Sequence, residues 1–124
     1  MDKSQDSKEF GQYAESITAD SYLKQGFTVL ERNWRLGKTE IDLIVQKDDT
    51  LVIVEVKGRS GRDEEALSTV TRDKRRRMIR AADNYIKRLT GNYNYRFDIA
   101  TVTGQIGNCK LEIYEDAFVA ADYF

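Results

Sequence analysis

Hydrophobic residues follow two different periods along this chain, and each period predicts a different kind of element. Helical spacing predicts one helix over residues 8–25 and another over about 71–89. Alternating or continuous runs of aliphatic and aromatic residues predict strands over 27–33, 39–45, 51–57, 95–102 and 109–114. The order of one helix, three strands, one helix and two strands predicts an α/β fold with a mixed sheet flanked by helices.

The two central strands carry acidic residues inside apolar stretches. Asp42 stands between Ile41 and Leu43, and Glu55 follows four consecutive aliphatic residues, with Lys57 two positions later. A short polar turn joins these strands, which predicts a β-hairpin. Since side chains alternate along a strand, Glu55 and Lys57 share one face. An ionised carboxylate in apolar surroundings is costly unless a cation or several donors compensate for the lost water. The hairpin therefore predicts a metal site, with Asp42 and Glu55 as oxygen ligands and Lys57 beside them.

Other groups could complete this site. Glu40 has the same strand parity as Asp42 and is a rival ligand, although exposure at the strand mouth is the simpler interpretation. Glu15, at the edge of the apolar stripe of the first helix, could be an outer ligand or hold a water, and the Val56 carbonyl is a third candidate ligand. The alternative interpretation of the acids is a solvated strand face, which is the commoner one for an isolated acid-x-lysine triplet.

Composition narrows the chemistry that such a site could perform. The absence of histidine excludes His-dependent zinc sites, Ser-His-Asp triads and histidine general bases. Carboxylate ligands favour Mg²⁺, Mn²⁺ or Ca²⁺. Such an ion acidifies a bound water and stabilises charge during attack on a phosphodiester, while Lys57 could orient or activate that water. The pattern therefore favours phosphodiester hydrolysis that depends on Mg²⁺ or Mn²⁺.

Length and composition also bound the organisation of the chain. The 124 residues predict a single domain over 1–124. No apolar run approaches the roughly 20 residues that cross a bilayer, and the polar N-terminus does not have the pattern of a signal peptide. Cys109 is the single cysteine, which excludes an intrachain disulfide, and we expect a cytoplasmic protein. We expect residues 1–7 to be a disordered tail and 58–70 to be a mobile loop.

The beginning of the second predicted helix is strongly basic. Residues 72–80 hold six cations and one acid, although the formal net charge of the chain is −1. A run of charge is usually a solvated helix face. Lys74, however, lies one turn before the buried stripe and could point toward the sheet and its site. We expect this region and the loop before it to contact nucleic acid through Arg59, Lys74, Arg75, Arg76 and Arg80.

Three other features predict packing rather than chemistry. Arg96 and Asp98 flank Phe97, which favours a structural ion pair at the start of a strand. Trp34 could stack on a base, but a role in packing is the favoured interpretation. Cys109, within a predicted strand, is expected to be a small apolar filler.

Several short motifs occur in order along nearly the whole chain: Gly11-x-x-x-Glu15, Gly26-Phe27, Arg32-Asn33-Trp34-Arg35, Glu40-Ile41-Asp42-Leu43-Ile44, Val54-Glu55-Val56-Lys57, Val70-Thr71, Lys74-Arg75-Arg76-Arg77, Arg96-Phe97-Asp98 and Asp116-Ala117-Phe118. Together they resemble the YraN-like family of bacterial proteins. That family is largely uncharacterised, is regarded as restriction-endonuclease-like, and is distantly similar to archaeal Holliday junction resolvases. The resemblance implies the PD-(D/E)xK nuclease fold, with Asp42, Glu55 and Lys57 at the motif positions and Glu15 at the helical acid.

The sequence departs from the family pattern at two points. Ile41 stands where the motif has proline, and Thr39 stands where a glycine is expected before Glu40. We expect a Mg²⁺- or Mn²⁺-dependent DNA endonuclease similar to a resolvase, acting on branched or single-stranded DNA, and a homodimer would suit cutting of both strands. One alternative is a nucleic-acid-binding module of the same fold with little catalysis. Another is a structural protein whose acids are satisfied by Arg35, Lys38 or Lys57.

Overall fold

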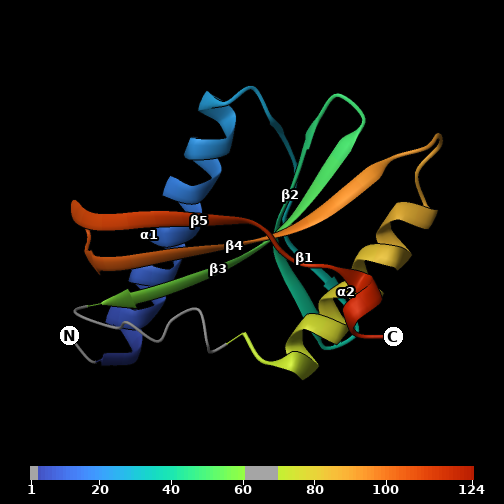
Figure 1. Cartoon of the computed structure of the whole chain (residues 1–124). Coiled ribbons are helices and arrows are strands. Elements are labelled where there is room, and N and C mark those ends of the chain that lie inside the picture. The colour runs from blue at the N-terminus through green and yellow to red at the C-terminus, as the bar shows by residue number, and fades with distance from the viewer. Residues whose placement is uncertain (1–2, 61–69) are drawn as a thin grey trace.

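The computed structural model describes residues 3–60 and 70–124, and their elements form one layered α/β unit (Figure 1). In chain order the elements are α1 (Lys3–Lys24), β1 (Thr28–Leu36), β2 (Thr39–Lys47), β3 (Thr50–Ser60), α2 (Arg72–Lys87), β4 (Asn94–Gln105), β5 (Asn108–Phe118) and the 3₁₀ helix η2 (Ala120–Asp122). The two predicted helices and five predicted strands are confirmed in their predicted order, and so is the mixed sheet flanked by helices.

The sheet has five strands in the spatial order β1-β2-β3-β4-β5. β3 and β4 are parallel, and every other neighbouring pair is antiparallel. The parallel pair needs a crossover connection, and α2 lies within it. In Figure 1 the strands cross near the centre of the view and fan out on both sides, as a strongly twisted sheet does.

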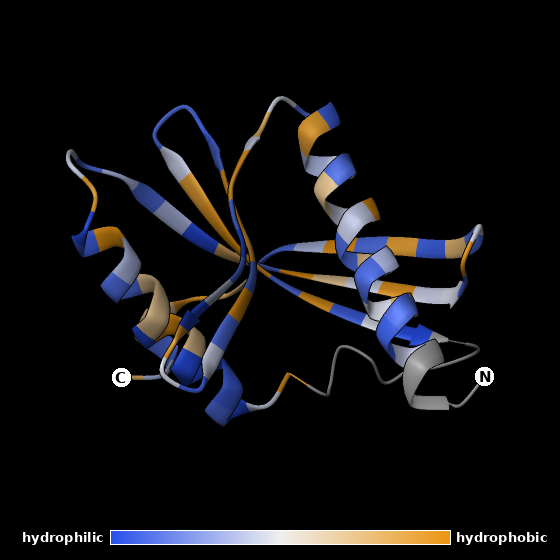
Figure 2. Cartoon of the chain, turned by 180° about the vertical axis from the view of Figure 1, so that it is seen from behind, coloured by the Kyte–Doolittle hydropathy of each residue, from blue (hydrophilic) through white to orange (hydrophobic). Residues whose placement is uncertain are grey.

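Each face of the sheet is covered by one helix. Leu43, Val52 and Val54 pack with Ala19 and Tyr22 on the α1 face. The strand residues of opposite parity form a second core with α2, made of Ile44, Ile53, Phe97, Ile99, Met78 and Ala82. Because both faces are buried, β2 and β3 read in the sequence as nearly continuous aliphatic runs. Figure 2 shows these hydrophobic strand centres and the hydrophilic first turns of α2.

Several predicted boundaries are corrected by the structure. The helix α1 begins at Lys3, so residues 3–7 extend a helix rather than form the expected tail. β3 continues to Ser60 beside β4, so residues 58–60 belong to a strand and not to the expected mobile loop. The rest of that predicted loop up to residue 69, and residues 1–2 of the predicted tail, lie outside the described residues. β5 continues to Phe118, well into a C-terminal region for which the pattern made no prediction.

The predicted ion pair of Arg96 and Asp98 is confirmed and belongs to a larger buried network. Arg96 Nε donates to Asp98 Oδ1 over 3.0 Å, and the Tyr22 hydroxyl donates to Asp98 Oδ2 over 2.6 Å. The Asp116 backbone N–H donates to Asp98 Oδ1 over 3.0 Å. A fully buried carboxylate is tolerated here because several donors replace its lost water. The network ties α1, β4 and β5 together.

Packing roles are also confirmed for the other two residues. Trp34 packs against the ring of Tyr85 on α2, with the ring centroids 5.2 Å apart. Cys109 packs beside the small core of Phe10, Ala14 and Val102. None of the helices in the described residues is long and apolar enough to span a bilayer.

Candidate metal centre

The regular alternation of β2 breaks at Asp42. The pairing of β2 with β3 ends at Leu43 and Val54, so the two strands separate beyond that point. Ile41 joins the α2-side core together with Ile44, although strict alternation would place Ile41 on the opposite face. The Asp42 side chain is therefore free to enter the gap between the strands, where its Oδ2 accepts the Val56 backbone N–H over 2.8 Å.

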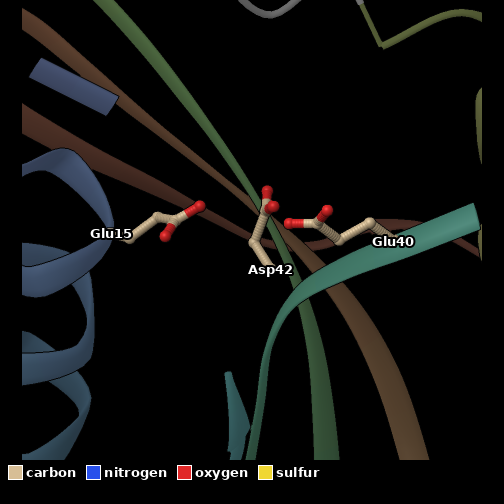
Figure 3. Close-up of side chains that lie close together, drawn as sticks. All are labelled: Glu15, Glu40 and Asp42. Carbon is tan, nitrogen blue, oxygen red and sulfur yellow. The ribbon is translucent and has the colours of Figure 1, made fainter. Parts of the chain in front are cut away.

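Three carboxylates meet where the strands separate. One oxygen each of Glu15, Glu40 and Asp42 lies within 4.8 Å of the others. Figure 3 shows Asp42 between the other two, with Glu15 reaching in from α1 and Glu40 from β2. Gly58 permits the close approach of α1, because a Cβ at this position would lie only 3.0 Å from the Ala14 Cβ. Glu40 and Asp42 point the same way, as predicted, but Glu40 is 29% exposed and ion-paired rather than simply exposed at the strand mouth. That these acids and Glu15 hold a metal stays a prediction.

Neighbouring donors already hold two of these acids. With its amide nitrogen turned toward the acids, Asn33 donates to Glu40 Oε1 over 2.8 Å and to Glu15 Oε1 over 3.2 Å. Asn33 lies in β1 in the left-handed region, with φ at 52°. Asparagine adopts that conformation more readily than most residues. Arg35 pairs with Glu40 Oε2 over 2.7 Å, so this arginine lies on Glu40 and not on the embedded acids for which the structural alternative expected it.

Glu55 contacts Asp42 from the neighbouring strand, but it does not belong to the three-carboxylate cluster. Its side chain lies on the α2 face and is only 5% exposed. Lys74 Nζ lies 3.3 Å from Glu55 Oε2, confirming that Lys74 points toward the sheet. This contact is an ion pair without hydrogen-bond geometry, and within the described residues Oε2 has no hydrogen-bond partner. Lys74 is positioned in the first turn of α2, where the Thr71 hydroxyl accepts its backbone N–H over 3.2 Å.

Burial and mutual repulsion shift the ionisation of these acids. Burial, followed by the hydrogen bond and the negative charge of Glu55, raises the pKa of Asp42 to about 9, against the opposing effect of the Val56 N–H. Burial also raises the pKa of Glu15, where the Asn33 hydrogen bond opposes the shift and the charge of Glu40 adds to it. With this raised pKa, Asp42 carries a proton at neutral pH unless a nearby cation compensates for its charge.

Comparison with known proteins places this constellation in a family. The model of the uncharacterised protein family UPF0102 matches residues 14–102. This range contains the four acids of the site, Glu15, Glu40, Asp42 and Glu55, and also Lys57. The chain belongs to the UPF0102 family. This membership confirms the predicted YraN-like resemblance.

The relatives of this UPF0102 protein match it over most of their length. A UPF0102 protein of Bacteroides fragilis is 41% identical over 110 residues, which cover 87% of this chain and 90% of that protein. A UPF0102 protein of Nitrosomonas europaea is 38% identical over 109 residues, covering 87% and 92%. The solved structure of Pyrococcus furiosus SfsA in complex with Ca²⁺ is 13% identical with a TM-score of 0.31, over 92% of this chain and 62% of that one. A similarity this weak carries no argument about the UPF0102 protein.

Lys57 lies beyond Glu55 on β3, opposite Thr101 of β4. Its strand parity places it on the same face as Glu55, as predicted. Among residues 3–60 and 70–124, its ammonium group has no hydrogen-bond or ion-pair partner. Lys57 pairs with neither Asp42 nor Glu55, although the structural alternative expected such a pair. Lys74 pairs with Glu55 instead.

The predicted phosphate-binding arginines have different surroundings. Arg75 is part-buried and donates to the Val70 carbonyl and the Tyr123 hydroxyl, so its guanidinium is engaged in structure. Arg76 donates to the Tyr123 carbonyl, while Arg80 is exposed over the Phe124 ring. Arg59 donates to the Gly58 carbonyl over 3.1 Å.

Sequence analysis missed Asn33 as a member of the site, because it appeared only as a letter of a family motif. It lies in β1 next to Trp34, which pairs with Ile41 of β2, and asparagine is a residue type that tolerates positive φ. Lys74 was assigned to nucleic acid, and the structure gives it a direct contact with Glu55 as well. Spacing indicated the direction of Lys74, but the identity of its partner depends on how α2 docks on the sheet.

Proposed function

We propose that this UPF0102 protein is a divalent-metal-dependent endonuclease that hydrolyses phosphodiester bonds in DNA. The observation that supports this most directly is Glu55 Oε2, which is buried and has no hydrogen-bond partner in the described part of the chain, next to an Asp42 whose pKa is raised to about 9. Buried acids without sufficient donors reduce stability, and a divalent cation would compensate for all of them at once.

The residues present fit a hard cation. All the candidate ligands are carboxylate oxygens, which suit Mg²⁺ or Mn²⁺. Asp42 would hold the ion together with Glu55, as the sequence predicted, or with Glu15 and Glu40, whose oxygens are within 4.8 Å of its own. Such an ion, when bound, would neutralise phosphate charge and acidify water.

The chain's own residues supply the remaining functions in this proposal. Lys57 has no partner within residues 3–60 and 70–124 and lies on the face of Glu55, so it would orient the attacking water or accept its proton. Asn33 would hold Glu15 and Glu40 at the distance that the site requires. Lys74 neutralises Glu55 in the absence of a cation. The basic first turns of α2 would attract the phosphate backbone of DNA.

A second candidate function is a nucleic-acid-binding module with little or no catalysis. The observation that favours it is the set of protein cations already on the acids, namely Arg35 on Glu40 and Lys74 on Glu55. If these pairs satisfy the acids permanently, no metal is needed. The two functions share a DNA-binding surface and differ only in the requirement for a cation.

Cleavage assays on a panel of DNA structures would separate the two functions. Single-stranded, duplex and four-way-junction DNA would be incubated with the protein and Mg²⁺ or Mn²⁺. We expect cutting of at least one substrate, abolished by EDTA and by Glu55→Gln, which keeps the shape of the side chain and removes its charge. Binding to DNA with no cutting under either metal would favour the second candidate function and contradict the first.

A further inference from the structure

The last residues of the chain are fixed on the basic helix α2. Arg76 Nε donates to the Tyr123 carbonyl over 3.2 Å, and an Arg72 terminal nitrogen donates to the Asp122 carbonyl over 3.1 Å. Tyr123 is itself 9% exposed and stacks edge-on against Phe118. Figures 1 and 2 both show this C-terminal segment beside α2. The backbone that carries Phe124 is thus held in place up to the residue before it.

The Phe124 ring stands out from this anchored segment. The residue is 66% exposed, the most exposed of the large hydrophobic residues in the described part of the chain. The guanidinium groups of Arg76 and Arg80 lie over the ring, 5.8 Å and 5.4 Å from its centroid. Both contacts come from the same helix one turn apart. The structure therefore holds an exposed aromatic ring next to two guanidinium groups on this surface.

The surroundings of the ring are predominantly positive. The exposed residues Arg72, Arg77 and Arg80 belong to a run with six cations and one acid over 72–80. The acids on the helix are Asp73 and Asp83, of which Asp83 pairs with Lys87, and Asp122 lies in η2. This positive charge favours a polyanion as the partner over a basic or a neutral molecule.

We propose that Phe124, Arg76 and Arg80 form a binding site for single-stranded nucleic acid, in which an unpaired base stacks on the ring and the arginines contact the adjoining phosphates. Aromatic rings in basic surroundings bind unpaired bases through stacking, whereas the bases of a duplex are stacked on one another and not accessible to the ring. The inference rests on the proposed function for the class of ligand. The inference adds that the protein prefers unpaired strands, and it places their binding site on α2 and the C-terminal segment, outside the acidic cluster.

Binding without divalent cations tests this inference separately from catalysis. Fluorescence anisotropy in EDTA would compare a labelled single-stranded oligonucleotide with its duplex, for the wild type, Phe124→Ala and Phe124→Leu. Ile106→Ala is the matched control, because Ile106 is 57% exposed at the β4–β5 turn, away from the basic helix. The melting temperatures of all variants would be measured in parallel.

We expect both Phe124 variants to lose roughly tenfold in affinity for the single strand, with little change for the duplex. Ile106→Ala should bind as the wild type does. Full affinity in Phe124→Leu would show that an apolar contact suffices without stacking, and would overturn the proposal. An equal loss of affinity for the duplex would also overturn it. Wild-type protein that binds neither DNA, and instead associates through Phe124 with a protein, would also overturn it. Because no cation is present, an inactive metal site affects none of these outcomes.

Discussion

Replacing Asp42 by asparagine is expected to stabilise the metal-free protein, by about 2–4 kcal/mol at pH 8. Asparagine can accept the Val56 N–H and donate to Glu55, so it reproduces the protonated form of Asp42 without the cost of binding a proton at pH 8. The free energy of unfolding in urea, measured in EDTA at several pH values, would show the effect. A protein is expected to become more stable when an acid is removed that is needed for a functional site and not for folding.

The sign of the pH dependence follows from the raised pKa of Asp42. Its carboxyl has a pKa of about 9 in the folded protein and an ordinary value of 3.8 when unfolded. Between those values the folded protein binds more protons than the unfolded one, so stability falls as pH rises. The contribution is fully present below about pH 4 and is lost progressively up to about pH 9. Asp42→Asn should remove this slope.

An exposed acid provides the control for this experiment. Asp20 on α1 is exposed and shows no interaction in the described residues, so Asp20→Asn should leave both stability and its pH dependence unchanged. If Asp42→Asn were as stable as the wild type at pH 8, or less stable, Asp42 would not be the destabilising group that the structure implies.

Replacing Lys57 by alanine is expected to reduce metal-dependent cleavage by about 10²–10⁴-fold, the range typical of a lost general base or water-orienting group. Lys57 has no ion-pair partner in the described structure, so its removal breaks no ion pair and should change the melting temperature little. DNA binding in EDTA should change little. The measurement is a single-turnover cleavage rate, on whichever DNA the wild type cuts.

Lys24→Ala is the matched control, since Lys24 is exposed in the last turn of α1. It should cut at the wild-type rate. Cleavage by Lys57→Ala at the wild-type rate would remove Lys57 from the proposed mechanism. It would then point to Lys74, the other lysine at the site, which lies 3.3 Å from Glu55.

The hydrophobic pattern predicted the elements well because the sheet is buried on both faces. β2 and β3 must be aliphatic nearly throughout, so the acids within them were conspicuous in the sequence. The helical acid Glu15 and the inward-facing Lys74 could also be anticipated from spacing. Ends of elements were less predictable: the first turns of α1 are polar, and β3 continues to Ser60 because β4 pairs with it.

The details of the site depended on tertiary geometry that no periodicity encodes. Strict alternation does not predict that Asp42 leaves its face, which follows from the end of the β2–β3 ladder. Glu40 and not Glu55 completes the three-carboxylate cluster, because Asn33 and Arg35 bring Glu40 toward Glu15. Such departures from local rules are expected where a chain serves function at the expense of stability.

Binding of Mn²⁺ to the wild type and Asp42→Asn tests most directly whether these acids hold a divalent cation. Titration calorimetry supported by the Mn²⁺ electron paramagnetic resonance signal would measure it in the absence of DNA. We expect the wild type to bind Mn²⁺ and Asp42→Asn to bind it more than about tenfold more weakly. Equal affinity in the two proteins, or no binding by the wild type, would contradict this expectation.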